Sequence, residues 1–270
     1  MKKLLLFFIL SILIVSCSSE NKKQFEYAGG TVALSIENEP TTFVPRDVSD
    51  YYSAAVLTQV MEGLVSMDPK DLKIQPQIAS SWKISDDGLN YEFDIRKNVY
   101  FHPSNSFNSK EDRLLTPEDI QSSIEQACSK NDLGQAPHAY SFVFNEILGA
   151  EEFLIGKAKT IAGLKIKGSK VSLTLIQKDE NFLNKLANIC ASITSAKLKN
   201  SENDKEMIGT GPFMLSSFTQ GTPPKMVMVK NIDYYLNDQE GNALPYLDSL
   251  VFYFQNRKLD QLEMFENHQT

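Results

Sequence analysis

The sequence predicts a mixed helix and sheet fold of the α+β class, in which strands and helices follow one another without a regular βαβ period. Some segments alternate apolar and polar residues as strands do, and others repeat apolar residues at helical spacing. Glycine and proline mark the boundaries between these segments. The 270 residues, 42% hydrophobic and 23% charged, are typical of a globular protein and allow one large domain or two smaller ones.

The N-terminus precedes the fold. Two lysines come before an apolar run, residues 4–15, which is too short for a comfortable membrane span and ends at Ser16. This arrangement predicts a signal peptide over residues 1–16. Cys17 follows directly, and "IVSC" resembles a bacterial lipobox, in which the cysteine is lipidated and becomes the new N-terminus. Residues 17–28 would then be a polar tether. The alternative is an ordinary signal peptide with a chance cysteine.

The first predicted elements are a strand, a loop and a helix. A Gly-Gly break precedes an alternating segment, residues 29–38, which predicts a strand, and residues 41–50 are predicted as a loop. Valine and leucine recur on one face of a helix predicted over residues 51–65. Asp68 and Pro69 mark the corner of a strand–turn–strand unit that follows.

The clearest strand pattern is "ISDDGLNYEFDIRKNVYF", residues 84–101. Apolar and polar side chains alternate from Leu89 to Arg96, directly after an Asp-Asp-Gly turn signal. This alternation predicts a hairpin with one buried face. A second hairpin, with a Gly-Ser turn, is predicted over residues 163–176.

Residues 115–131 carry the clearest helix pattern. Thr116 suits the N-cap, Pro117 suits the first helical position, and Asp119 completes a capping box. Further helices are predicted over residues 145–160 and 179–192, β-like segments with glycine and proline corners over 208–235, and an apolar strand over 247–256.

Several classes of function find no support in the sequence. A net charge of −7 leaves no basic excess to meet phosphates, which argues against nucleic-acid binding. The chain lacks a GxSxG elbow, a Walker A loop, an HExxH helix and a CxxC pair, and its three histidines lack metal-ligand spacing. "GTGPF", residues 209–213, lacks the third glycine of a dinucleotide loop and predicts a strand-entry turn. We therefore expect no catalytic role, no cofactor and no metal.

Cys128 and Cys190 remain once Cys17 is assigned to the lipid. In an exported protein such a pair can form a disulfide. Both cysteines lie on the apolar faces of predicted helices, which is also the setting of small buried thiols. We predict free thiols because a fold of this size needs no covalent staple, and the disulfide stays open as the alternative.

Five short motifs occur in order and carry a resemblance to a known family. They are "MEGLVSMDPKDLKIQPQIASSWKISDDGLNYEFDIRKNVYFH", "LTPEDIQSSIEQA", "IAGLKIKGSKVSLTL", "IGTGPFML" and "VKNIDYYLND". This series, within residues 30–256, resembles the extracellular solute-binding proteins of family 5, the oligopeptide- and dipeptide-binding receptors of ABC importers. The resemblance implies a periplasmic-binding-protein-like fold whose two lobes close on a ligand. It also implies peptides held extended through main-chain hydrogen bonds, although relatives bind nickel chelates, haem or oligosaccharides.

The resemblance further implies a division of the first lobe into two subdomains. One is discontinuous, residues 29–54 and 195–270, and the other is inserted, residues 55–194. Family members are much longer than this chain, so we expect the second lobe to be missing. A truncated gene product and a functional one-lobe protein are both compatible with that expectation.

Candidate ligand contacts follow from the resemblance by position. Ser49, Asp50 and Tyr51 lie at the start of the first predicted helix, where the family lines its cleft. The alternative for Ser49 or Asp50 is capping of that helix.

A second cleft-facing stretch of the family matches Tyr234, Tyr235 and Asn237. Tyr235 stands where the family usually has tryptophan. The alternative is core packing by the two tyrosines and a turn at Asn237.

The sequence as a whole thus predicts an exported solute-binding lipoprotein of an ABC-type import system. Its expected partners are a peptide or other small solute, an ABC permease, and the membrane of the cell envelope through the lipid anchor. The competing interpretation is an interaction or vestigial lipoprotein that kept the scaffold and lost transport.

Overall fold

The computed structural model describes residues 28–131, 133–198, 207–267 and 270. The predicted signal peptide, Cys17 and all but the last residue of the predicted tether lie outside these described residues. The strands are β1 (Thr31–Ile36), β2 (Val65–Met67), β3 (Ile74–Pro76), β4 (Ala79–Ile84), β5 (Asn90–Ile95), β6 (Leu164–Lys167), β7 (Lys170–Thr174), β8 (Phe213–Thr219), β9 (Lys225–Lys230) and β10 (Ser249–Phe254).

The α-helices are short. They are α1 (Tyr51–Leu57), α2 (Pro117–Ala127), α3 (His138–Phe142), α4 (Ala150–Leu154), α5 (Phe182–Leu186) and α6 (Lys258–Glu266). Short 3-10 helices are η1 (Pro45–Asp47), η2 (Glu111–Arg113), η3 (Phe144–Glu146), η4 (Ile189–Ala191) and η5 (Ala196–Leu198). Strands and helices therefore mix as predicted.

One antiparallel sheet has the strand order β4-β5-β7-β6. Tyr91 pairs with Leu173 and Phe93 with Val171, and all four side chains are buried. Glu92, between the two aromatic residues, faces the other side of the sheet and forms an ion pair with Lys170. Both predicted hairpins are confirmed, with one buried and one polar face.

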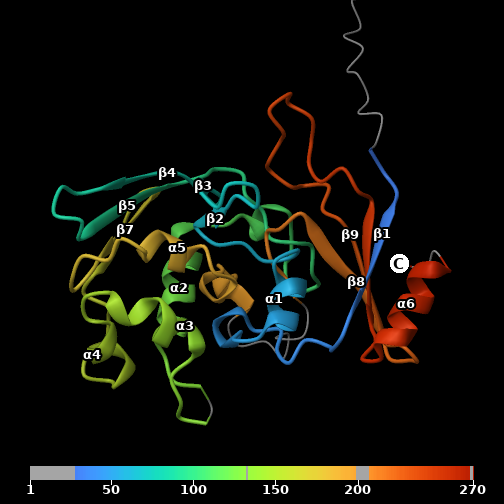
Figure 1. Ribbon diagram of the computed structural model, residues 1–270. Coiled ribbons are helices and arrows are strands. Elements are labelled where there is room, and N and C mark those ends of the chain that lie inside the picture. Colours follow the sequence, from blue (N-terminus) through green and yellow to red (C-terminus); the bar gives the residue numbers. More distant parts are fainter. Residues whose placement is uncertain (1–27, 132, 199–206, 268–269) are drawn as a thin grey trace, which may run out of the picture.

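The second four-stranded sheet is mixed, with the order β1-β10-β9-β8. β1 runs parallel to β10, in register from Thr31 opposite Ser249 to Ile36 opposite Phe254. The other two pairings are antiparallel. Strands near the two ends of the described chain thus lie side by side, which Figure 1 shows beside α6.

Each sheet has its own hydrophobic cluster. The β4-β5-β7-β6 sheet packs against α2 and α5, and this cluster includes Phe93, Ile124 and Phe182. The β1-β10-β9-β8 sheet packs against α1, through residues such as Leu57 and Phe252. α1 lies between the two sheets in Figure 1. The subdomain boundaries at 54/55 and 194/195 stay a prediction.

The helix predicted over residues 51–65 is wrong in length, because α1 ends at Leu57. The backbone carbonyl groups that follow accept hydrogen bonds from a distant segment instead of from the next helical turn. The Gln59 carbonyl accepts from the Phe213 amide at 3.0 Å, and the Val60 carbonyl accepts from the Gly211 amide at 2.9 Å. A helix that continued through this point would have to give up these tertiary hydrogen bonds.

Other helix predictions differ in extent from the structure. The helix over 115–131 is confirmed as α2, with the predicted capping box at Thr116. The helix over 179–192 breaks into α5 and η4 because the Asn188 side chain accepts from the Cys190 amide at 3.1 Å and starts a new turn. Only α4 and part of η3 form within 145–160, and α3 and α6 were not predicted.

Cys128 and Cys190 are free and buried, as predicted. Burial raises the pKa of each thiol to about 12. Both thiols are therefore protonated at neutral pH and pack as small apolar side chains.

Candidate functional site

Asp50 is the N-cap of α1. Its Oδ1 accepts from the Ser53 amide at 2.9 Å, and its Oδ2 accepts from the Thr41 hydroxyl at 2.6 Å. Burial acts to raise the pKa of Asp50, but the hydrogen bonds from Ser53 and Thr41 outweigh it and hold that pKa below its ordinary value. The carboxylate is thus ionised at neutral pH and fixes the start of the helix.

Ser49 and Tyr51 flank this cap and remain exposed. The Tyr51 side chain is 71% exposed, and its ring meets the ring of Tyr52 edge-on, with centroids 5.5 Å apart. Tyr52 is held in turn by a hydrogen bond from its hydroxyl to Glu37 at 3.2 Å. The first helix therefore presents a hydroxyl and an aromatic ring to solvent from a fixed backbone.

The structure places the second group of predicted contacts on the segment that follows β9. The Tyr234 hydroxyl donates to Oε1 of Glu62 at 2.8 Å, and the Tyr235 ring lies 5.6 Å from the Arg96 guanidinium. Both tyrosines are partly buried, whereas Asn237 is exposed and its backbone bridges to Ala243.

The two predicted groups are not joined to each other. Among the described residues, no hydrogen bond or ring contact links Ser49, Asp50 or Tyr51 to the segment from Tyr234 to Asn237. The candidate site is therefore two separate stretches of surface rather than one cluster of contacting side chains.

Glu62 is a key residue of the site that the sequence analysis missed. Its side chain is 2% exposed and accepts from Gln77 at 3.1 Å and from Thr210 at 2.7 Å, in addition to Tyr234. Burial raises the pKa of Glu62 to about 7, against the opposing effect of these hydrogen bonds. The available signal was a single acid within the apolar run "VMEGLV", because a buried carboxylate requires polar partners.

The "GTGPF" segment contacts this carboxylate through Thr210, and its two glycines permit the approach. A Cβ at Gly209 would lie 2.0 Å from the Val60 carbonyl oxygen, and one at Gly211 would lie 2.6 Å from it. Only glycine leaves room for the 209–211 backbone against the chain after α1. The strand-entry turn predicted here is thus also a packing contact.

His102 holds the same loop from another side. The Gly209 amide donates to its Nδ1 at 3.3 Å, and its Nε2 lies 2.9 Å from the Gly211 carbonyl oxygen. This arrangement fits the neutral ring with its proton on Nε2. Burial lowers the pKa of His102 to about 4, so the ring is neutral at physiological pH.

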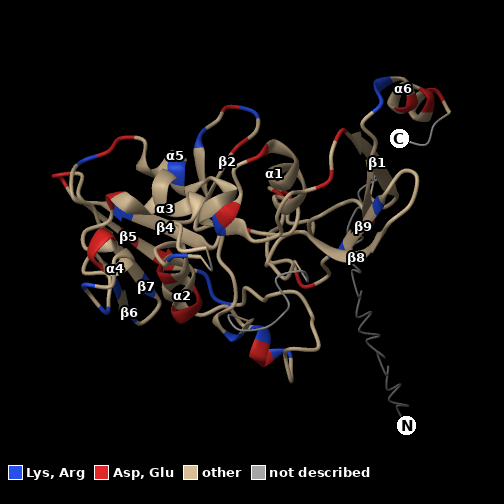
Figure 2. Ribbon diagram, turned by 90° about the horizontal axis from the view of Figure 1, so that it is seen from below, with Lys and Arg blue, Asp and Glu red and all other residues tan. Residues whose placement is uncertain are grey.

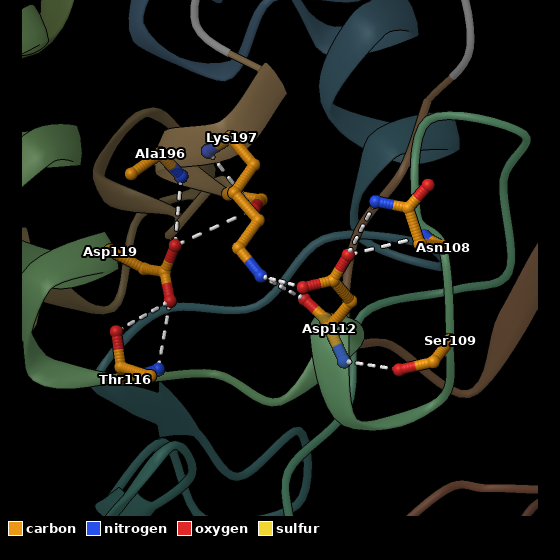
Figure 3. Close-up of polar contacts among 8 residues, drawn as sticks. Asn108, Ser109, Asp112, Thr116, Asp119, Ala196 and Lys197 are labelled. Atoms are coloured by element: carbon orange, nitrogen blue, oxygen red, sulfur yellow. Dashed lines mark hydrogen bonds and ion pairs between the residues drawn. The ribbon is translucent and has the colours of Figure 1, made fainter.

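Polar contacts also fix the chain at η5. Figure 3 shows Asp119 of α2 accepting from the Ala196 amide, at 2.8 Å, and from Thr116. The same view shows Lys197 paired with Asp112. These contacts tie the segment around η5 to α2 and to η2.

A cavity of about 80 Å³ lies between the two hydrophobic clusters, with Phe43, Ile124 and Met207 among its lining residues. None of the six predicted ligand contacts lines it. The predicted ligand contacts therefore lie outside this cavity.

The described part of the chain offers no candidate for a metal site. No group of three or more histidine, cysteine, aspartate or glutamate side chains is placed there to hold a metal ion. No helix among those residues combines the length and hydropathy of a membrane span. Lysine, arginine, aspartate and glutamate positions are interspersed over the ribbon in Figure 2.

Comparison with known proteins identifies similar chains. The family model for bacterial extracellular solute-binding proteins, family 5 Middle, matches residues 73–270. Di/tripeptide-binding protein 3 of Pseudomonas aeruginosa is 29% identical over 206 residues, which cover 72% of this chain and 37% of that protein.

Two solved structures resemble the fold. The periplasmic oligopeptide-binding protein OppAIV from Borrelia burgdorferi gives a TM-score of 0.74 at 25% identity, over 88% of this chain and 45% of the other. The periplasmic binding protein DppA from Helicobacter pylori, in complex with the peptide STSA, gives 0.72 at 23% identity, over 90% and 46%. The chain spans less than half the length of these relatives.

Proposed function

Because this chain belongs to the bacterial extracellular solute-binding proteins of family 5, we propose that it supplies one ligand-binding face of an exported receptor. The receptor would take up peptides, or another small solute, for an ABC-type importer and would act with its permease. The names of the relatives support a peptide ligand.

The observation that carries this proposal is the start of α1. Asp50 is committed to the helix cap, whereas Ser49 and the 71% exposed Tyr51 are free of it. An extended peptide offers main-chain hydrogen-bonding groups and apolar side chains, which a hydroxyl and an aromatic ring can meet without selecting a sequence. A capped helix start holds these groups in place before the ligand arrives, which lowers the entropic cost of binding.

The second stretch would contribute in a different way. Asn237 is exposed, so its amide is available to a ligand backbone. The Tyr234 hydroxyl is engaged by Glu62, so Tyr234 and Tyr235 would offer ring surface rather than hydroxyl groups.

The proposal includes a lipid anchor. The lysines at positions 2 and 3, the apolar run and Cys17 support export followed by lipidation of Cys17. On this proposal the protein works in the cell envelope, attached to a membrane through its N-terminal lipid.

Peptide titrations monitored by NMR test the binding face. With the chain from residue 18 onward and mixed di- to pentapeptides, the amides of Ser49 and Tyr51 should shift. Tyr51→Ala should weaken binding by roughly fivefold, since a lost aromatic contact is worth about 1 kcal/mol. Leu133→Ala, at a side chain 80% exposed on another loop, is the matched control and should bind as the wild type does.

Two results would contradict the proposed function. One is that the NMR signals of the amides around α1 do not shift at millimolar peptide. The other is that Tyr51→Ala binds peptide as tightly as the wild type does. The first result would favour the alternative, an interaction lipoprotein that kept the scaffold.

A further inference from the structure

Glu62 connects segments that are far apart in the sequence. It follows α1, and its carboxylate accepts from Gln77, after β3, from Thr210, before β8, and from Tyr234, after β9. The three donor–acceptor distances lie between 2.7 and 3.1 Å. The backbone of Glu62 is also held, since its carbonyl accepts from the Ile193 amide at 2.8 Å. A rigid acceptor therefore stands where both halves of the molecule meet.

One buried donor beside this carboxylate is unused. The Tyr235 hydroxyl lies next to Glu62 but outside hydrogen-bonding geometry, and it has no other hydrogen-bond partner in the described part of the chain. A carboxylate offers about four acceptor positions, and three are occupied. The remaining position and the free hydroxyl are complementary.

The charged and titratable groups around Glu62 are few. Tyr234 and Tyr235 face it from the segment after β9, and the Arg96 guanidinium, after β5, lies over the Tyr235 ring. Gln77 and Thr210 are neutral. The ring nitrogens of His102 contact the backbone of Gly209 and Gly211 rather than Glu62. Burial raises the pKa of both tyrosines, so they stay protonated and act as hydroxyl donors at neutral pH.

We propose that Glu62 is a positioning residue whose ionisation sets the placement of Tyr234 and Tyr235 on the ligand-binding face. The ionised carboxylate accepts from the Tyr234 hydroxyl and offers its remaining acceptor position to the Tyr235 hydroxyl, which keeps the two rings against the chain after α1. Protonation removes one acceptor position and forces one hydroxyl to turn from donor to acceptor, which loosens that hold. The link to ligand affinity rests on the proposed function, whereas the placement of the rings does not.

Glu62 gains and loses its proton in the neutral pH range, because burial raises its pKa to about 7. Ligand affinity should therefore rise with pH from 6 to 8 if these rings line the site. The expected gain is roughly fivefold, which corresponds to about 1 kcal/mol, the worth of one hydrogen bond.

NMR of ring-labelled tyrosines in the full chain tests the placement without any ligand. The Tyr234 and Tyr235 resonances, assigned with tyrosine-to-phenylalanine variants, should titrate together with a midpoint near pH 7. Glu62→Gln should abolish this titration. Glu146→Gln is the control, since Glu146 is a partly buried carboxylate that pairs with Lys185 instead of the tyrosines, and it should leave the titration intact. Rings that do not move between pH 5.5 and 8.5, or that still titrate in Glu62→Gln, would overturn the proposal.

A second variant keeps the test decisive if Glu62→Gln does not fold. Tyr235→Phe removes a donor to the charged form, so the midpoint observed at Tyr234 should move to higher pH. An unchanged midpoint would overturn the role assigned to the Tyr235 hydroxyl.

Peptide titrations at pH 6 and pH 8 complete the test. Tighter binding at pH 8 in the wild type and equal binding at both values in Glu62→Gln would support the proposal. Titrating rings with equal wild-type affinity at both values would overturn the link to ligand affinity. Titrating rings with no peptide binding at either pH would refute the proposed function and leave the positioning role in place.

Discussion

At the scale of single residues, His102 ties the 209–211 loop to the β4-β5-β7-β6 half of the molecule through both ring nitrogens. The pKa of this ring falls from 6.5 to about 4 on burial. Between these pH values the unfolded chain binds a proton that the folded protein does not. The free energy of unfolding should therefore decrease as the pH falls from 6.5 toward 4, by up to about 3 kcal/mol.

His102→Asn is expected to remove this dependence. At pH 7 the variant should be less stable than the wild type by about 1–3 kcal/mol, because a buried hydrogen bond is lost. The difference in the free energy of unfolding between the variant and the wild type should narrow toward pH 4.5, because the wild type loses the stability contributed by neutral His102. Urea unfolding at several pH values measures this difference in the free energy of unfolding. The raised pKa of Glu62 makes stability change with pH in the opposite direction, but it does so equally in both proteins and cancels in the difference. A gap that stays constant with pH would show that His102 does not titrate in this range.

The residues of the candidate site were only partly predictable. Position relative to the family's cleft pointed to Ser49, Asp50 and Tyr51, and the alternative of helix capping describes the contacts of Asp50. The apolar run around Glu62 marks a buried acid, but its partners could not be predicted, because Gln77, Thr210 and Tyr234 come from segments whose proximity no local pattern encodes. Buried polar networks of this kind are a property of the folded chain.

At the scale of elements, patterns predicted the strands better than the ends of the helices. Period-two alternation located β5 and β7 because one face of their sheet is buried. α1 ends before the helix predicted over residues 51–65, because amides of the 209–213 segment donate hydrogen bonds to the carbonyl groups of Gln59 and Val60. Helix ends depend on such tertiary competition, whereas α2 carries its own start signal in Thr116 and Asp119.

Asp119→Ala tests how much α2 depends on this start. The Asp119 carboxylate accepts from the Thr116 amide, from the Thr116 hydroxyl and from the Ala196 amide. Its removal should lower the free energy of unfolding by about 2–4 kcal/mol, the sum of a lost cap and an unsatisfied amide. Chemical denaturation followed by circular dichroism measures the change. Glu118→Ala, at the exposed neighbouring position, should stay within about 0.5 kcal/mol of the wild type. Equal effects of the two substitutions would contradict the role given to Asp119.

At the scale of the whole molecule, the order of short motifs identified the family, because five weak signals in sequence are more specific than any one of them. The pairing of β1 with β10 is a different matter. Local periodicity predicted both strands, but it carries no information about which strands become neighbours. Only the family resemblance implied that the two ends of this lobe meet.

The proposed lipid anchor predicts how the complete protein partitions. In a detergent phase separation the wild type should enter the detergent phase, and Cys17→Ala should move to the aqueous phase. A single acyl chain binds a membrane only marginally, so this expectation assumes more than one chain on the cysteine. Cys128→Ala, at a buried thiol, serves as the control and should partition as the wild type does. Unchanged partition of Cys17→Ala would exclude lipidation at that residue.

The parallel pairing of β1 with β10 also constrains the order in which the two four-stranded sheets can form. Thr31 and Ser249 are hydrogen-bonded although they lie 218 positions apart in the sequence, whereas the β4-β5-β7-β6 sheet draws its strands only from residues 79–174. Closing a longer loop costs more chain entropy, and distant pairings slow folding. During synthesis, β1 cannot pair with β10 until the chain has been made as far as Phe254. By then the β4-β5-β7-β6 sheet already has all of its strands.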